Sequence, residues 1–288
     1  MRELAGKKLG NVTFSEQDGK MYATVVNSGV TAHYEIKDIE YKAPCEAILM
    51  DLDGTTLTSE EFWVFIIEET MKKLMEDESF KLEEADIPFV SGFTTADHLT
   101  YCINKYAKGA DINRALEIYH KTTEYELGRI MKGEGHVEAF TPAEGLKEFL
   151  LGVKEKGIKI GLVTSGLDYK AIPEIVAVFK TLDMGDPLKF YDTIITGGRR
   201  KDVGDYGTLG EIVSKPHPWL YTETAYMGLK VKNPEHVLGI EDSAAGAIAL
   251  RVAGFPVVGL ECGNIGDSGL DGLCYAKPDN LQQILDLI

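Results

Sequence analysis

Short apolar runs of strand length alternate with helical stretches from Ala47 to the end of the chain. Five such runs occur, at residues 47–50, 158–163, 193–195, 237–240 and 256–258. Helical segments that can cross over between strands include residues 143–155 and 169–180. This alternation is typical of βαβ units around a parallel sheet. We therefore predict the α/β class for most of the chain.

The interval between the first and second apolar runs is too long for a single crossover connection. Three stretches within it place apolar residues at spacings of three and four, at residues 60–76, 96–107 and 113–131. Such spacing is typical of amphipathic helices. We therefore predict a helical domain, residues 58–140, inserted directly after the first strand of a core made of residues 43–57 and 141–288.

Residues 1–42 have a different pattern and are predicted to form a small β-extension. Segments 11–16, 21–26 and 30–36 are rich in Val, Thr, Tyr and Phe, and turn signals lie at 17–20 and 27–29. A sheet this small is marginal alone, so its apolar face should pack on the main body or on a second subunit. A homo-oligomer formed through this extension is one possible consequence.

The charge balance narrows the classes of partner. With 30 Lys and Arg against 46 Asp and Glu, the formal net charge is −16. Such a surface repels nucleic acid and anionic membranes. The first residues contain no apolar run suited to a secretory signal, and no later run approaches the ~20 residues of a membrane span. We expect a soluble cytoplasmic protein, without a disulfide framework because its four cysteines form no C-x-x-C pair.

The segment Asp51-Leu52-Asp53-Gly54-Thr55 follows the first apolar strand directly. Ligands bind at the carboxyl ends of strands in open parallel sheets, and two carboxylates there can meet one ligand if Gly54 turns the chain. An acidic turn on an acidic protein would explain the segment equally well. An EF-hand loop is excluded, because Thr55 and Thr56 stand where that loop needs a ligand and a glycine.

Glu241-Asp242-Ser243 follows another apolar strand and precedes a run of small residues. An acidic helix N-cap is the simpler interpretation of this segment alone. Together with Asp51 and Asp53, however, it would gather up to four carboxylates at neighbouring strand ends. A hard divalent cation relieves the repulsion among them, and Mg²⁺ suits carboxylate and carbonyl oxygens, water and phosphate.

Two further elements are weaker on their own. Thr164-Ser165-Gly166 ends the strand at 158–163 and is suited to binding a phosphoryl oxygen. Lys215 stands between Ser214 and Pro216, and a solvated lysine is the default interpretation. The order of the four elements, a carboxylate pair, a hydroxyl, a lysine and an acidic pair, is more informative than any one of them.

That ordered set resembles the haloacid dehalogenase superfamily of phosphotransferases, and within it the β-phosphoglucomutase and phosphatase subgroup. The resemblance covers residues 47 to about 287, with the helical insertion in the place of the type 1 cap. It implies a Rossmann-like core with an inserted α-helical cap. It also implies hydrolysis of a small phosphorylated metabolite.

The resemblance further implies a role for each matching residue. Asp51 is the expected nucleophile and Asp53 the expected general acid and base. Thr164 and Lys215, with Ser165 and Gly166, would bind the phosphoryl group and neutralise its charge. Mg²⁺ would be held by Asp51, the carbonyl of Asp53, and Asp242, with Glu241 nearby or in direct contact.

Departures from the relatives narrow the activity. Dehalogenases and phosphonate-cleaving members lack the second aspartate, so Asp53 argues against both. β-Phosphoglucomutase has a histidine where Trp63 stands, and a basic residue in a cap segment where this chain has Gly92-Phe93-Thr94-Thr95. Hydrolysis of a monophosphate ester, of the sugar or polyol phosphate class, is therefore favoured over a phosphomutase.

Other interpretations stay open at this point. A non-catalytic phosphoacceptor or binding module could keep the fold, although Asp53 would then have no use. Phe62, Trp63 and Phe93 are suited either to a substrate pocket or to the core. The basic stretch in the 197–214 loop would attract an anionic substrate or be an ordinary solvated loop.

Overall fold

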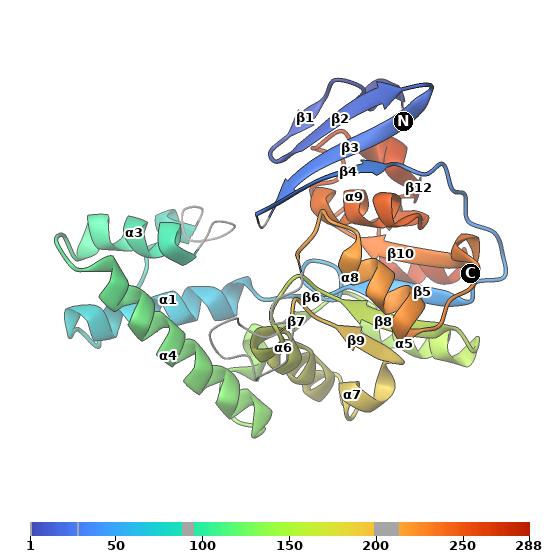
Figure 1. The fold of residues 1–288 in the computed structure, drawn as a ribbon. Helices are drawn as coiled ribbons and strands as arrows, with labels where there is room; N and C mark the ends of the chain where they lie inside the picture. The colour runs from blue at the N-terminus through green and yellow to red at the C-terminus, as the bar shows by residue number, and fades with distance from the viewer. Residues whose placement is uncertain (1, 28, 88–94, 199–212) are drawn as a thin grey trace. The chain divides into compact units, whose positions relative to one another are not determined.

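The computed structural model describes residues 2–27, 29–87, 95–198 and 213–288 (Figure 1). The chain divides into two compact units. The first contains Met1–Leu57, Pro142–Ala171 and Leu182–Ile288, and the second contains Thr58–Thr141 and Ile172–Thr181. No helix in the described ranges is both long and apolar enough to span a membrane.

A parallel sheet forms the centre of the first unit. Among the described residues it has six strands in the order β12-β11-β10-β5-β8-β9. The strands are β5 (Ala47–Asp51), β8 (Lys159–Val163), β9 (Thr193–Ile195), β10 (Val237–Glu241), β11 (Val257–Gly259) and β12 (Cys274–Ala276). Every residue of β5 and β10 is buried, as expected for parallel strands covered on both faces. The predicted α/β class with a Rossmann-like core is confirmed.

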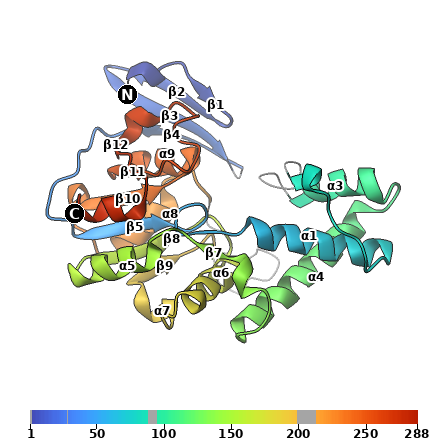
Figure 2. The ribbon, with the colours of Figure 1, turned by 180° about the vertical axis from the view of Figure 1, so that it is seen from behind.

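Helices cover both faces of this sheet. Figure 2 shows α5 (Leu146–Glu155) on the face opposite α9 (Ala244–Ala253). Ser243 caps α9 by accepting a hydrogen bond from the Gly246 amide, and Gly254 ends it in the left-handed conformation. Further helices are α6 (Asp168–Thr181), most of which belongs to the second unit, α7 (Pro187–Phe190), α8 (Trp219–Thr222), which runs into a π-helical turn at Glu223–Gly228, and α10 (Leu281–Leu285).

The pairing register decides which side chains meet at the end of the sheet. Asp51 of β5 pairs with Val163 of β8, and Met50 pairs with Ile240 of β10. Thr164, which follows Val163, and Glu241, which ends β10, therefore lie at the same edge of the sheet as Asp51. This edge is the carboxyl end of the parallel strands.

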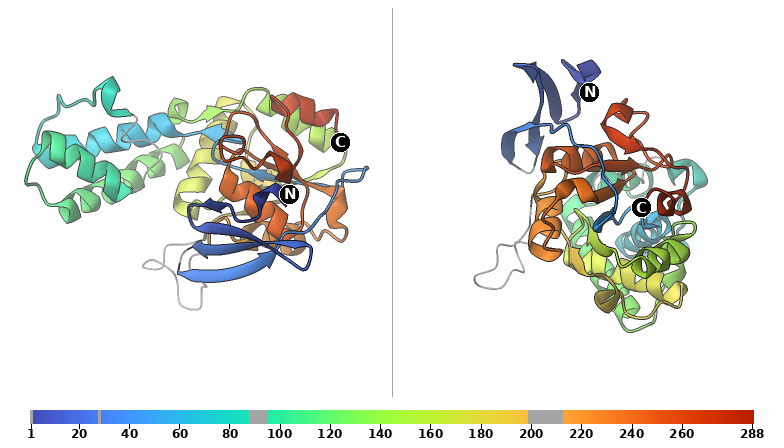
Figure 3. Two further views of the ribbon diagram at one scale, coloured as in Figure 1. Left: turned by 90° about the horizontal axis from the view of Figure 1, so that it is seen from above. Right: turned by 90° about the vertical axis from the view of Figure 1, so that its right-hand side faces the viewer.

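The N-terminal segment forms a separate antiparallel sheet in the order β1-β2-β3-β4. Its strands are β1 (Lys8–Leu9), β2 (Val12–Gln17), β3 (Lys20–Asn27) and β4 (Val30–Glu35). The predicted strands correspond to β2, β3 and β4. Strand β1 is only two residues long and was not predicted. Alternate residues such as Phe14, Ala23 and Val25 are buried and belong to one apolar cluster with Leu250 and Val252 of α9. The extension therefore packs on the main body (Figure 3).

The second unit is built from helices α1 (Glu60–Met75), α3 (Thr95–Tyr106) and α4 (Ile112–Met131). These correspond to the three predicted helical stretches. Phe62 of α1 is fully buried and packs on Phe140 at 4.6 Å between ring centroids. Phe62 is therefore a core residue of this unit. The chain passes between the units at β6 (Leu57–Thr58) and β7 (Thr141–Pro142), which form a two-stranded sheet. The boundaries 1–42, 43–57 with 141–288, and 58–140 stay a prediction.

Candidate active site

A tight turn after β5 places the first carboxylates. Asp51 ends the strand and is 5% exposed, whereas Asp53, two residues later, is exposed. The Thr56 amide donates to the Leu52 carbonyl at 2.8 Å, and the Gly54 amide donates to Leu57 O at 2.8 Å. Gly54 has a φ of 82°, and a Cβ there would lie 2.2 Å from Oδ2 of Asp242. Glycine is therefore required both for the turn and for the approach of Asp242.

Lys215 Nζ lies between two carboxylates of neighbouring strands. It donates to Asp51 Oδ1, and to Glu241 Oε1 at 2.7 Å. Burial alone would lower the pKa of Lys215, but Asp51 and Glu241 outweigh burial and hold that pKa above its usual value. Lys215 is therefore charged and paired with two carboxylates. The interpretation of Lys215 as a solvated lysine does not hold.

Glu241 is fully buried and satisfied by the protein. Its Oε1 accepts from Lys215 and from the Tyr221 hydroxyl, and its Oε2 accepts from the amide and the hydroxyl of Ser243 at 3.2 and 2.9 Å. A Cβ at Gly246 would lie 1.7 Å from Glu241 Oε1, so only glycine fits beside this carboxylate. Four donors fix Glu241 in one orientation, and it in turn orients Lys215.

Tyr221 is a site residue that the sequence did not reveal. It lies in α8, is fully buried, and its ring lies 5.0 Å from Lys215 Nζ. Burial, with the charges of Glu241 and Asp51, raises the pKa of its hydroxyl well above its usual value. No spacing or motif distinguishes it from the other tyrosines, because its partner Glu241 is 20 residues away and on another element.

Asp242 completes an acidic cluster. One oxygen from each of Asp51, Glu241 and Asp242 lies within 4.8 Å of the others. Burial and the charge of Glu241 raise the pKa of Asp242 to about 6, and burial and Glu241 also raise that of Asp51 well above its usual value. Three carboxylates therefore lie beside the single positive charge of Lys215.

The cluster suits a divalent cation with oxygen ligands, such as Mg²⁺. Glu241 already accepts four hydrogen bonds, whereas Asp51 and Asp242 present carboxylate oxygens at the carboxyl edge of the sheet. Asp51 and Asp242 are therefore the better-suited side-chain ligands, and Glu241 the better-suited orienting group. The donor set fits the ion that the sequence predicts.

Asp53 and Thr164 face each other across the edge of the sheet. The Thr164 hydroxyl lies 3.5 Å from Asp53 Oδ2, a long hydrogen bond, and accepts from the Gly166 amide at 2.9 Å. Ser165 Oγ accepts from the backbone amide of Lys215 at 3.2 Å. The structure thus brings all the predicted site residues to one edge of the sheet. Ser165 contacts the lysine backbone, a role that its sequence position did not indicate.

Several predicted features lie outside this cluster. Phe93, most of the segment Gly92–Thr95 and the basic stretch 199–201 fall outside the described residues. Trp63 is described, and its indole N–H donates to Ser59 Oγ at 3.2 Å.

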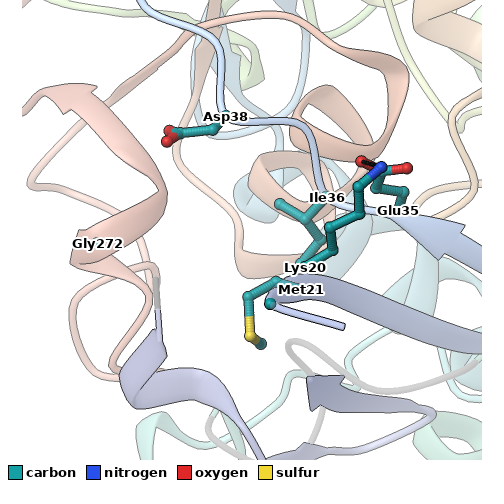
Figure 4. Close-up of a pocket in the computed structure, with 7 residues that line it drawn as sticks. Lys20, Met21, Glu35, Ile36, Asp38 and Gly272 are labelled. Carbon is teal, nitrogen blue, oxygen red and sulfur yellow. Dashed lines mark ion pairs between the residues drawn. The ribbon is translucent and has the colours of Figure 1, made fainter. Parts of the chain in front are cut away.

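A hollow of 630 Å³ lies elsewhere, lined by the N-terminal sheet and Gly272, and contains the Lys20–Glu35 ion pair at 2.8 Å (Figure 4). None of the site residues lines it.

Residues 45–254 match the model of the haloacid dehalogenase-like hydrolases. The chain belongs to this family. The family predicted from the four motifs, and with it an enzyme of the hydrolase class, is therefore confirmed. The match includes both carboxylate motifs, Thr164 and Lys215, and excludes the N-terminal sheet.

Solved structures show the same fold. A candidate phosphatase from Clostridium difficile is 19% identical, with a TM-score of 0.61 over 85% of this chain and 99% of that one. A candidate β-phosphoglucomutase from Thermotoga maritima is 22% identical, with a TM-score of 0.58 over 84% and 97%. A mutant of CbbY from Rhodobacter sphaeroides, bound to xylulose-1,5-bisphosphate, is 20% identical, with a TM-score of 0.55 over 83% and 95%. At these identities the likeness concerns the fold.

Proposed function

We propose that this hydrolase is a Mg²⁺-dependent phosphatase of a small phosphorylated metabolite, of the sugar or polyol phosphate class. The observation that carries the proposal is the placement of Lys215 Nζ against Asp51 at the end of β5, with Asp53 two residues later and Thr164 beside it. A nucleophile, an acid and cationic and hydroxyl donors for a phosphoryl group thus lie together. That CbbY binds a sugar bisphosphate supports this substrate class.

The reaction proceeds in two transfers. Asp51 Oδ attacks phosphorus, the bond to the ester oxygen breaks, and Asp53 donates a proton to the departing alcohol. Asp53, now ionised, takes a proton from water as that water attacks the aspartyl-phosphate. The phosphorus–oxygen bond to Asp51 breaks, and inorganic phosphate and the free carboxylate result. The exposure of Asp53 suits contact with both the leaving group and water.

The remaining residues stabilise charge. Lys215 and the Thr164 hydroxyl donate to the phosphoryl oxygens, where negative charge accumulates in transfer. Asp51 and Asp242 would hold Mg²⁺, which would neutralise their carboxylates and the charge of the phosphoryl group. Glu241 holds Lys215 in place through the bond at 2.7 Å.

Two alternatives differ from this proposal in what they require. A phosphomutase of the β-phosphoglucomutase type needs a second cationic phosphate site, and the cap segment that would carry it lies mostly outside the described residues. A non-catalytic phosphoacceptor needs only Asp51 and has no use for Asp53 as a general acid. The placement of Asp53 beside Thr164 favours turnover.

Hydrolysis of p-nitrophenyl phosphate, with and without Mg²⁺, tests the proposal. Wild-type protein should release p-nitrophenol only with Mg²⁺, and excess EDTA should stop the release until Mg²⁺ is restored. Asp51→Asn should lower the rate by a factor of about 10³ or more, because the nucleophile is gone. Asp18→Asn, at an exposed turn carboxylate, is the matched control and should retain the wild-type rate.

Wild-type turnover by purified Asp51→Asn, or full activity in EDTA, would contradict the mechanism. If no release occurs, acetyl phosphate separates the alternatives. A stable phosphoryl adduct on Asp51 without turnover would support the phosphoacceptor. Conversion of a sugar monophosphate to its positional isomer would support the mutase.

A further inference from the structure

The N-terminal sheet lies outside the residues that match the hydrolase family, yet it contacts the segment that carries Lys215. We propose that this sheet is part of the active-site scaffold and that Asn27 and Tyr34 are positioning residues for Lys215. The inference rests on the proposed function, because it assigns the two residues to the support of its cationic group. Both residues and Lys215 belong to the same compact unit.

Asn27 binds the backbone carbonyl of Lys215 and the side chain of Ser214. It is the last residue of β3, where the strand pairs with β4 across the turn. Its side-chain amide donates to Lys215 O at 2.8 Å and to Ser214 Oγ at 2.9 Å. The Lys215 amide donates in the opposite direction, to Ser165 Oγ at 3.2 Å. The lysine backbone is therefore held between the parallel sheet and the N-terminal sheet.

Tyr34 reaches the same segment through His217. The Tyr34 hydroxyl lies 2.8 Å from His217 Nδ1, and His217 Nε2 lies 3.4 Å from Asn27 O. A carbonyl can only accept, so Nε2 carries the proton, and Nδ1 accepts from the tyrosine. His217 is fully buried and stacks on Trp219. Strands β3 and β4 therefore each fix one nitrogen of this ring.

The lysine segment needs such support because it has little of its own. Residues 213–218 form neither helix nor strand, and Pro216 and Pro218 have no amide hydrogen to donate. The main-chain bond that closes the turn is His217 N to Ser214 O at 3.2 Å. Buried backbone groups outside regular structure need side-chain, backbone or water partners. For this segment, those partners include Asn27, Tyr34 and Ser165.

The N-terminal sheet is itself anchored. Val25 and Ala23, two and four positions before Asn27 in β3, are fully buried in the apolar cluster shared with α9. A strand that is fixed in a close-packed core holds the segment bound to it in a fixed position. Lys215 Nζ must lie between Asp51 and Glu241, and small misplacements of catalytic groups have large effects on rate.

Three variants and a matched control test the inference. Asn27→Ala, Tyr34→Phe and the double variant remove donors to the lysine segment. Thr24→Val is the control, because Thr24 Oγ1 also lies 2.8 Å from a histidine Nδ1, that of His33, in the same sheet but away from this segment. Asn27→Ala should lower kcat for p-nitrophenyl phosphate about tenfold, Tyr34→Phe about threefold, with smaller changes in KM. Thr24→Val should retain the wild-type kcat.

A double-mutant cycle shows whether the effect passes through Lys215. If Asn27 acts by positioning Lys215, Asn27→Ala should have almost no further effect on kcat in a Lys215→Ala background. A tenfold loss in both backgrounds would show that Asn27 acts on the fold in general, and would overturn the inference.

Hydrogen exchange gives a readout that does not need activity. Amides of residues 213–222 should exchange faster in Asn27→Ala and Tyr34→Phe than in wild type and Thr24→Val. Unchanged exchange would overturn the inference even if the protein is an active phosphatase. Faster exchange in these variants, together with no ester hydrolysis by the wild-type protein, would support the contact of Asn27 and Tyr34 with the Lys215 segment. It would overturn the phosphatase proposal instead. Faster exchange with an unchanged kcat would overturn the positioning role.

Discussion

At the scale of single residues, glycines and buried donors give the acidic cluster its form. Gly54 and Gly246 leave room for Asp242 and Glu241, at positions where a Cβ would lie 2.2 and 1.7 Å from carboxylate oxygens. Tyr221 and Ser243 donate to Glu241, so this buried charge is hydrogen-bonded as well as paired with Lys215. The two glycines are therefore explained by the carboxylates that a side chain would overlap, and the acidic residues by their chemistry.

Gly246→Ala should lower the thermal unfolding midpoint, because the new methyl group overlaps the fixed Glu241 carboxylate. A cost of about 1–3 kcal/mol is expected from such overpacking. Gly128→Ala is the matched control, since Gly128 lies in α4 and a Cβ added there would have no atom within 4 Å. Alanine there should raise stability by about 0.5–1 kcal/mol. Two shifts of the same sign in differential scanning fluorimetry would contradict this account.

At the scale of elements, strand register assembles the site. Neighbouring parallel strands end together, so residues after β5, β8 and β10 meet although they are far apart in the chain.

The helical unit has its own polar centre. Asp86 is fully buried there, and its carboxylate accepts from the Tyr101 hydroxyl at 2.6 Å, from Lys105 Nζ at 2.6 Å and from the Tyr106 hydroxyl.

Asp86→Asn should destabilise the helical unit by about 2 kcal/mol at pH 7, because the paired charge is lost. Burial raises the pKa of Asp86, but Lys105 and the two tyrosines outweigh it and hold the pKa well below its usual value. The stabilisation is therefore complete above the unfolded value of about 3.9 and is lost as pH falls toward the folded pKa.

Thermal unfolding of wild type and Asp86→Asn at several pH values measures this difference. The gap between the two midpoints should be constant from pH 7 to 5 and should shrink below about pH 4. Glu78→Gln, at an exposed carboxylate, should follow wild type throughout. A gap that does not change with pH would show that the Asp86 charge contributes nothing.

At the scale of the whole molecule, the N-terminal sheet and the hydrolase core share one apolar cluster. Strand residues such as Phe14 and Val25 are buried with Leu250 and Phe255. The apolar face that could have met a second subunit is thus covered within one chain. Assembly into a homo-oligomer through this extension stays a prediction.

Removal of residues 1–42 should expose the apolar surface of α9 and withdraw Asn27 and Tyr34 from the Lys215 segment. The truncated chain should bind an apolar dye such as ANS and be less soluble than the full chain, because large exposed apolar patches promote association. Wild-type solubility, dye binding and activity after truncation would show that the extension is dispensable.

The predictions from sequence were most accurate where a local pattern carries the information. Alternation of apolar runs with helical spacing located the strands β5, β8, β9, β10 and β11 and the helices α1, α3 and α4. Asp51-Leu52-Asp53-Gly54-Thr55 and Glu241-Asp242-Ser243, with Thr164 and Lys215 in order between them, indicated the family. Strand β1 and the support of Lys215 carry no periodic signal and were not predicted.

The sequence by itself determined strands β5, β8, β9, β10 and β11, helices α1, α3 and α4, the α/β class and the identity of the acidic, hydroxyl and cationic residues. Only the tertiary structure decided that Glu241 is satisfied by the protein, that Tyr221 belongs to the site, and that Asn27 binds the backbone of Lys215 across 188 positions of sequence. The physical reason is that periodicity and capping act over a few neighbouring residues. Contacts between distant segments depend instead on sheet register and packing, which no short pattern encodes.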